Sequence, residues 1–290
     1  MNDKICVITG ANSGIGKVTA EKLAKQGTRV VMLCRNEEKA ERAKEDILRV
    51  CGHNRVDIVL ADLASAGQIR AAAEHINEDY PKIDLLINNA GLMTDNKRNT
   101  TEDGFEMTFG VNHLAPFLLT QLLLDKVIAS ERGNIINVSS EAHRFASFDL
   151  TDLQYERRKY NGLKAYCSSK LANILFTREL SRRLPTHVVT NALHPGAVAS
   201  NFGSGVSSFF GIIFKLAKPF MISAEEGAET SIYLATSDEG WTVSGKYFKE
   251  KEAVKPNKDA SNDYNAQRLW EISEELLQIE FLPKKSVSSA

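Results

Sequence analysis

The sequence predicts an α/β protein: a single domain with a doubly wound, mostly parallel sheet of seven strands flanked by helices. Short apolar runs alternate along the chain with amphipathic segments of helical length. Several runs are apolar at every position, which is typical of strands in a parallel sheet that helices cover on both faces. The first run leads directly into a glycine-rich turn and then a helix, an arrangement that such sheets use at their ligand-binding edge.

The elements follow in a regular order over residues 1–290, with no internal repeat and no long linker. We expect strands at 4–9, 29–34, 56–61, 83–88, 134–139, 187–193 and 245–248. We expect helices at 15–26, 37–50, 65–80, 103–130, 163–184, 224–236 and 262–278; the last begins near Ser261 and Asn262, which are good cap residues. Strand–helix alternation at this spacing indicates right-handed βαβ units.

Composition excludes some function classes. The formal net charge is −1, so no global basic field points to nucleic acid. The four cysteines form no CxxC pair and no Cys/His cluster with metal-ligand spacing, so we expect no metal site and a reducing compartment. The first strand begins almost at once, and no run of about 18 uncharged apolar residues occurs. We therefore expect a cytoplasmic protein with no signal peptide and no transmembrane segment.

The turn "TGANSGIG" predicts a dinucleotide site of the Rossmann type. Gly10, Gly14 and Gly16 lie between the first strand and a helix with apolar spacing. Glycines permit a tight turn and let backbone approach a pyrophosphate, and the helix N-terminus offers N–H groups to the phosphates. A tight strand–helix turn that binds no ligand is the alternative.

The end of the second strand favours NADP(H) over NAD(H). An acidic residue there would bind the ribose hydroxyls of NAD, but this position holds Cys34, and Arg35 follows it. A guanidinium suits a 2′-phosphate through its charge and its paired donors. An ordinary surface arginine is the alternative.

The spacing Gly-x-x-x-Gly-x-Gly in this turn resembles that of the short-chain dehydrogenase/reductase family. The likeness continues in the family's order over roughly residues 4–200, through "ADL", "NNAG", "VNHLAPFLLT", "NVSS", "AYCSSK" and "HPGAV". Within the family, the chain is similar to the retinol dehydrogenase group and its bacterial relatives in "GIGKVTA", "LCRN", "YCSSKLANILFTREL" and "RLWEISEELL".

The resemblance implies a set of cofactor-binding residues. Those for the phosphates and the adenosine half are Gly10, Asn12, Ser13, Gly14, Ile15, Gly16, Arg35, Asn36, Asp62, Leu63, Asn89, Ala90 and Gly91. Those for the nicotinamide half are Tyr166, Lys170, Pro195, Gly196, Val198 and Ser200. The implied cofactor is NADP(H).

Tyr166 and Lys170 are the expected proton-transfer pair. They stand at i and i+4, so their side chains share one helix face. A free phenol, with a pKa of about 10, exchanges its proton too reluctantly near neutral pH. The lysine ammonium and a nicotinamide cation both favour phenolate, so we expect a lowered pKa for Tyr166 as general acid/base.

Three further expectations concern the catalytic group. The family pattern assigns the substrate-oxygen contact to Ser140, with Ser139 structural. Asn112 resembles the family asparagine whose helix kink holds a relay water, although a structural role is the alternative. Cys167 is expected to pack rather than react, and we assign no catalysis to the histidines at 113, 143 and 194.

These residues predict an NADP(H)-dependent oxidoreductase that interconverts alcohols and aldehydes or ketones. A catalytically silent NADP-binding scaffold or redox sensor on the same fold is the alternative, but such proteins usually lose the tyrosine or the lysine. An extended-family epimerase would need a different glycine spacing and a larger C-terminal domain. The small-molecule substrate is expected to be lipophilic: retinal-like, or a medium- or long-chain aldehyde.

Three further expectations concern two segments near the substrate and the oligomeric state. Residues 203–222, "GSGVSSFFGIIFKLAKPFMI", have an apolar helical face behind two glycines and are expected to form a cover over the substrate. A packed helix or shallow docking on a membrane surface are the alternatives. Residues 143–162 either wall the cleft or dock on the surface through their aromatics. A homodimer through the helices at 103–130 and 163–184 is open, as in many family members.

Overall fold

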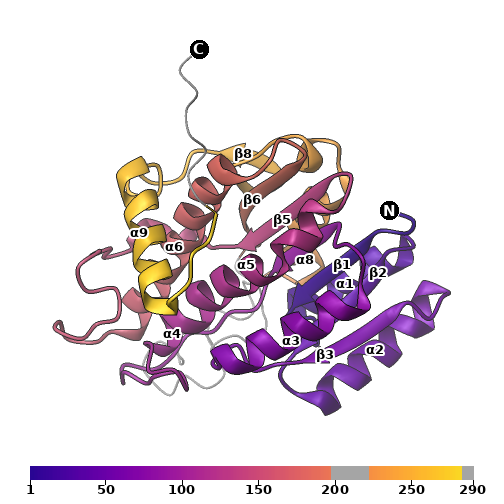
Figure 1. Cartoon of the computed structure of the whole chain (residues 1–290), viewed down its shortest axis with the longest axis horizontal. Helices are drawn as coiled ribbons and strands as arrows, with labels where there is room; N and C mark the ends of the chain where they lie inside the picture. The colour runs from indigo at the N-terminus through magenta and orange to yellow at the C-terminus, as the bar shows by residue number, and fades with distance from the viewer. Residues whose placement is uncertain (197–221, 283–290) are drawn as a thin grey trace.

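The computed structural model describes residues 1–196 and 222–282, and Figure 1 shows one sheet with helices on both faces. The strand order is β3-β2-β1-β4-β5-β6-β7-β8. The bounds are β1 Ile5–Thr9, β2 Arg29–Cys34, β3 Val56–Leu60, β4 Leu85–Asn88, β5 Gly133–Val138, β6 Val188–His194, β7 Tyr247–Lys249 and β8 Glu252–Val254. Strands β1 to β7 are parallel. The order reverses between β1 and β4, which is the switch point where such sheets bind ligands.

Within the described residues, the sheet has one strand more than the seven predicted. The added strand β8 pairs antiparallel with β7 at the sheet edge. The chain reverses through Glu250 and Lys251, whose φ angles are 52° and 67°. Hairpin turns with left-handed residues usually contain Gly, Asn or Asp. A Glu-Lys turn before a three-residue strand therefore gives no recognisable sequence pattern.

Helices cover the two faces of the sheet in two groups. One group is α1 Gly14–Lys25, α2 Glu37–Cys51 and α8 Ala224–Thr236; the other is α3 Ala66–Asp79, α5 Ala115–Ile128 and α6 Gly162–Arg183. Each group packs on its own apolar core. In β1, Val7 faces the α3/α5/α6 core, while Cys6 and Ile8 face the other. Burial on both faces explains why these strands are apolar at every position.

The helix expected at 103–130 is interrupted near its start. It consists of α4 Met107–Phe109, a π-helical turn at Gly110–Leu114, and α5. The N–H of Ala115 donates to the carbonyl of Gly110, five residues back. Pro116 has no N–H to give to the carbonyl of Asn112 four residues earlier. The proline therefore accounts for the wider turn, which lies at the predicted site residue.

Among the described residues, one helical stretch, Met107–Ile128, is long and apolar enough to cross a membrane. In this structure 83% of its most apolar window is buried within the fold. Its apolar residues therefore belong to the domain core.

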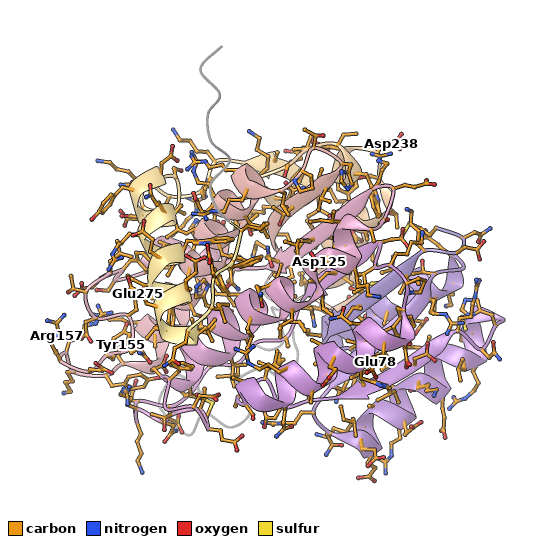
Figure 2. The ribbon with its side chains drawn as sticks, in the orientation of Figure 1. Glu78, Asp125, Tyr155, Arg157, Asp238 and Glu275 are labelled. Carbon is orange, nitrogen blue, oxygen red and sulfur yellow. The ribbon has the colours of Figure 1, made fainter. Side chains whose placement is uncertain are left out.

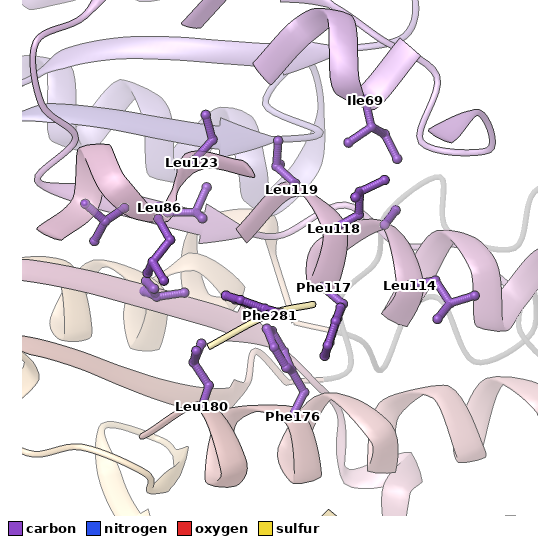
Figure 3. Close-up of a cluster of buried hydrophobic side chains, with 14 of the residues drawn as sticks. Ile69, Leu86, Leu114, Phe117, Leu118, Leu119, Leu123, Phe176, Leu180 and Phe281 are labelled. Carbon is purple, nitrogen blue, oxygen red and sulfur yellow. The ribbon is translucent and has the colours of Figure 1, made fainter. Parts of the chain in front are cut away.

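The C-terminal helix α9 Asp263–Leu277 packs over α6 and reaches α5. Phe117 of α5 and Phe176 of α6 contact Trp270 and Phe281, with the Phe117 and Trp270 rings 4.8 Å apart. Figure 3 shows Phe281 beside Phe176 and Phe117, whose own rings lie 5.3 Å apart. The guanidinium of Arg183 lies 4.2 Å from the Trp270 ring. A homodimer through α5 and α6 stays a prediction, and it would have to include or displace α9.

Residues 143–162 dock on the outside of the domain. The Tyr160 hydroxyl donates to Glu106 Oε1 at 2.7 Å, and the Tyr160 and Tyr155 rings meet edge-on with centroids 5.4 Å apart. Glu106 is fully buried and accepts two backbone N–H groups at the start of α4. Figure 2 shows Tyr155 and Arg157 at the outer edge of the molecule. The contacts of Tyr155 and Tyr160 fit an excursion docked by its aromatics, and a wall of the substrate cleft stays a prediction.

Candidate functional site

The turn between β1 and α1 is shaped by close backbone packing. Gly10 has a φ of 68°, a conformation that favours glycine. A Cβ on Gly16 would collide with the Gly10 carbonyl and lie 2.5 Å from Asn89 Nδ2. Asn89 Nδ2 donates to the Thr9 carbonyl at 2.8 Å, and Thr9 Oγ1 accepts the N–H groups of Asn89 and Ala90. Asn89 and Ala90, which follow β4, therefore hold the turn in place.

A cleft of about 460 Å³ opens beside this turn, at the carboxyl ends of the strands. Every residue predicted for the phosphates and the adenosine half lines it: Gly10, Asn12, Ser13, Gly14, Ile15, Gly16, Arg35, Asn36, Asp62, Leu63, Asn89, Ala90 and Gly91. Leu33, Cys34, Lys39, Ala61, Leu92 and Val111 complete the lining. Ligand pockets usually enclose roughly 300–1,000 Å³, so the cleft has the size for a large cofactor.

Two cations and one carboxylate meet at the β2 end of the cleft. Arg35 Nη1 lies 3.4 Å from Asp62 Oδ2, and 71% of the Arg35 side chain is exposed. Lys39 of α2 lines the same end. Sequence reasoning missed it because a lysine in a charged helix has no distinguishing spacing. The Asn36 side chain accepts the Lys39 N–H at 2.9 Å and caps α2. Cys34 is buried at the end of β2, and this burial raises the pKa of its thiol to about 11.

Ser140, after β5, lies together with Tyr166 and Lys170 of α6. Lys170 Nζ is 5.7 Å from the centre of the Tyr166 ring and donates to the Val138 carbonyl at 3.0 Å. A Cβ on Gly91 would lie 3.2 Å from Lys170 Nζ. Because Gly91 also lines the cleft, its missing side chain puts the buried ammonium next to the cofactor-sized space.

Burial shifts both members of this pair toward their neutral forms. It raises the pKa of Tyr166 above its usual range, and a hydrogen bond with the Ser140 side chain opposes that rise. It lowers the pKa of Lys170 to about 8. The expected lowering of the Tyr166 pKa is thus wrong for the protein alone, since desolvation of the phenolate dominates. Any lowering must come from a bound cation.

The two serines after β5 make different contacts. Ser139 is buried, and its hydroxyl donates to the Lys170 carbonyl at 2.6 Å. Ser140 is half-buried and begins the short 3-10 helix η2 Glu141–Phe145. Its Oγ accepts the Ala142 N–H at 3.2 Å, which leaves the hydroxyl proton available for a ligand oxygen or the tyrosine.

The Asn112 side chain is committed to the fold. Its Oδ1 accepts the Leu92 N–H, and its Nδ2 donates to the Leu92 carbonyl, both at 2.8 Å. The same Nδ2 lies 2.9 Å from Ser169 Oγ. Asn112 therefore fixes the cleft residue Leu92 against α6, and a relay role would fall to its backbone carbonyl in the π-helical turn.

The structure gives partners to the three histidines for which the sequence suggested none. His113 Nε2 contacts Ser273 Oγ of α9 at 2.8 Å, in an aromatic core where burial lowers its pKa to about 3. His143 Nδ1 contacts the Ser140 carbonyl, and His194 Nδ1 accepts the Glu141 N–H. The latter two contact the backbone of Ser140 and of the residue that follows it. His113 and Ser273 are 160 positions apart, and His194 and Glu141 are 53 apart, so no local signal identifies these pairs.

The nicotinamide-side residues are described only in part. Pro195 and Gly196 follow β6, and Gly196 has a φ of 97°. A Cβ there would collide with the side chain of Ile222. Val198, Ser200 and all of the expected cover except Ile222 lie outside the described residues.

Fold and site together define a class of protein: an oxidoreductase that binds a nicotinamide dinucleotide on a Rossmann-type sheet. The chain belongs to the short-chain dehydrogenase family, whose model matches residues 4–208. Within it, the protein is related to the retinol dehydrogenases.

That relation is seen in sequence and in structure. The chain is 46% identical to retinol dehydrogenase 13 of Homo sapiens, over 96% of this chain and 85% of that protein. It is 44% identical to human retinol dehydrogenase 12, over 95% and 87%. A crystal structure of an uncharacterised protein from Mycobacterium paratuberculosis is similar with a TM-score of 0.78 and 32% identity, covering 97% and 96%. A short-chain dehydrogenase from Escherichia coli CFT073, complexed with NADPH, shares the fold with a TM-score of 0.70 and 24% identity, covering 87% and 98%.

Proposed function

We propose that the protein is an NADP(H)-dependent oxidoreductase that interconverts alcohols and aldehydes or ketones, with Tyr166 as general acid/base. The observation that carries this proposal is the meeting of Ser140, Tyr166 and Lys170 next to a cleft lined by the glycine turn. A scaffold that only binds the dinucleotide has no need of a buried lysine beside a half-buried phenol.

The residues of the cleft fit NADP(H). Gly10 and Gly16 let the turn pack closely against Asn89. Helix α1 begins at Gly14 with no side-chain cap, so its first N–H groups can bind a pyrophosphate. Cys34 stands where NAD enzymes of this fold have an acid. Arg35 and Lys39 supply positive charge for a 2′-phosphate at the same end. The Escherichia coli relative complexed with NADPH supports the same choice.

The bound cofactor supplies or accepts the hydride, and the chain's own residues manage the substrate oxygen. The raised pKa of Tyr166 keeps it protonated, so it can donate a proton to an oxygen that gains negative charge. The Ser140 hydroxyl donates a second hydrogen bond to that oxygen and stabilises the charge. Lys170, buried 5.7 Å from the ring, favours the phenolate that remains.

We further propose that the substrate is lipophilic, either retinal-like or a medium- or long-chain aldehyde. We also propose that the enzyme is cytoplasmic, and a peripheral contact with a membrane is an open alternative. Two observations support the substrate class. Relatives at 42–46% identity are named retinol dehydrogenases. The segment 203–222, which follows the nicotinamide-side motif, contains Phe209, Phe210, Phe214 and Phe220.

A NADPH-oxidation assay on the full chain tests the proposal. Retinal, medium-chain aldehydes, quinones and ketosteroids are compared with short polar carbonyls, each with NADPH and with NADH. We expect turnover with NADPH that increases with apolar chain length. Best activity on short polar carbonyls would refute the lipophilic substrate. Tight NADPH binding without turnover on any compound would instead support a silent NADP-binding protein.

A further inference from the structure

The backbone around Ser140 is held by an imidazole on the following turn. The Ser140 carbonyl accepts two N–H groups of His143: the backbone N–H at 3.1 Å and ring Nδ1 at 2.8 Å. On the other side of the ring, Nε2 lies 3.2 Å from the backbone nitrogen of Asn257. The Asn257 side chain returns a bond to the His143 carbonyl at 3.1 Å. The imidazole thus bridges the Ser140 turn and the segment that leads into α9.

The partners determine which nitrogen of His143 carries the proton. A carbonyl can only accept, so Nδ1 must hold the hydrogen, and a backbone N–H can only donate, so Nε2 must be unprotonated. The ring is fully buried and packs edge-on against Tyr247, with centroids 5.0 Å apart. Burial also lowers its pKa, with Arg144 acting in the same direction and Glu141 against it. A neutral Nδ1–H imidazole satisfies every contact.

The Ser140 hydroxyl depends on the same turn. Its Oγ accepts the Ala142 N–H, which is aimed at it only while the 3-10 turn from Ser140 to His143 stays closed. A second imidazole holds the turn from the β6 side, where His194 Nδ1 accepts the Glu141 N–H at 3.2 Å. The Glu141 carboxylate accepts the Tyr247 hydroxyl at 3.0 Å. The backbone that carries the serine is therefore fixed from two neighbouring strands.

We propose that His143 is a positioning residue for Ser140: its Nδ1–H holds the serine carbonyl and so orients the serine hydroxyl toward the substrate oxygen. This inference rests on the role of Ser140 in the proposed function. In this proposal His143 contacts neither the cofactor nor the substrate.

A matched pair of variants separates the two sides of the ring. In His143→Asn the amide nitrogen takes the place of Nδ1 and keeps a donor for the Ser140 carbonyl. In His143→Gln the amide oxygen reaches the place of Nε2 and keeps an acceptor for the Asn257 N–H. We expect His143→Gln to lower kcat by about 10- to 100-fold, the scale of a misplaced catalytic group, with the KM for NADPH unchanged. His143→Asn should keep most of the wild-type kcat.

Both variants lose the ring contact with Tyr247, so each controls for the other in melting temperature. Equal kcat losses in the two variants, or a larger loss in His143→Asn, would overturn the proposal. That result would make His143 an anchor for the segment at Asn257 instead.

Ser140→Ala distinguishes this inference from the proposed function. If His143 acts through Ser140, adding His143→Gln to Ser140→Ala costs no further activity. Full activity of Ser140→Ala alone would refute the serine's proposed role. A further loss in the double variant would refute the positioning role. If the wild-type protein reduces no carbonyl, nitrogen NMR of the imidazole still tests the contact between His143 and the Ser140 carbonyl. That contact requires the Nδ1–H form of His143.

Discussion

The glycine turn and the proposed proton-transfer group, which consists of Ser140, Tyr166 and Lys170, lie at the same edge of the sheet, but they are built from different parts of the chain. At the turn, the backbone forms the site and side chains are kept out: a Cβ on Gly16 would collide with the Gly10 carbonyl. At the proposed proton-transfer group, side chains form the site, and contacts across the fold help to hold it. Lys170 is fixed on Val138, and Ser140 on His143, which in turn reaches Asn257.

The difference predicts two kinds of mutational response. Adding atoms at the turn should disturb geometry, so stability and cofactor binding should fall together. Removing atoms at the proton-transfer group should change the chemistry while the fold and cofactor binding survive. Four experiments test this contrast.

The largest effect is expected for Tyr166→Phe. Loss of the phenol removes the proton donor, and kcat should fall by about 10²-fold or more. Melting temperature and NADPH affinity should remain close to wild type. Tyr155→Phe is the matched control, because Tyr155 is buried and does not line the cleft, and this variant should turn over normally. Wild-type turnover by Tyr166→Phe would contradict the mechanism.

The next effect is expected for Gly16→Ala. The added methyl meets the Gly10 backbone and Asn89 Nδ2, so we expect a loss of about 1–3 kcal/mol in unfolding free energy, as for other overpacked sites. NADPH binding, measured by fluorescence titration, should weaken in parallel. Gly67→Ala in α3 is the control: its Cβ would have no neighbour closer than 3.8 Å, and stability should be kept or improved. If both variants behave alike, steric exclusion does not shape the turn.

A smaller effect is expected for Arg35→Ala. A charge-assisted contact with the 2′-phosphate is worth roughly 1.5–3 kcal/mol, and Arg35 must first leave its pairing with Asp62, so we expect about a tenfold increase in the KM for NADPH. Lys39→Ala should act in the same direction. Kinetics with NADH serve as the control and should hardly change. Equal increases in the KM for NADH and for NADPH would mean that neither cation binds the 2′-phosphate.

The same contrast explains how much the sequence could predict. The turn is encoded by consecutive residue types, so Gly10, Gly14 and Gly16 followed from a local pattern, and so did the seven parallel strands. The rest of the predicted cleft lining, such as Asp62 and Asn89, came from the resemblance to the family. The Tyr166/Lys170 register was equally visible, because the two residues share one helix.

What sequence reasoning missed depends on contacts across the fold. His143 meets Asn257 across 114 positions, and no spacing within either segment announces it. Lys39 lines the cleft, but a lysine in a charged helix has no distinguishing spacing. The Tyr166 pKa was predicted in the wrong direction because burial, which no local pattern reports, outweighs the hydrogen bond with the Ser140 side chain. Strand β8 was missed because the turn before it, Glu250 and Lys251, lacks the residues that usually form hairpin turns.

The smallest effect concerns pH and the buried lysine. Burial lowers the pKa of Lys170 from 10.5 to about 8. Between these values the unfolded chain binds a proton that the folded protein has released, so raising the pH stabilises the folded state. Below pH 8 both states are protonated, and the cost of the buried charge is constant. The unfolding free energy of the wild type minus that of Lys170→Met should therefore rise by about 1 kcal/mol from pH 8 to 9 and stay flat from pH 6 to 7.

Urea unfolding of both proteins at each pH measures this difference. Subtraction cancels the buried thiols of Cys34 and Cys167, whose raised pKa values destabilise the folded state as the pH rises above their ordinary value of 9.0. A difference that stays flat through pH 9 would mean that Lys170 keeps an ordinary pKa. The ammonium would then be solvated like a surface lysine. In that case the proton-transfer group would owe its chemistry to the bound cofactor, and the contrast with the backbone-built turn would rest on Tyr166 and Ser140 alone.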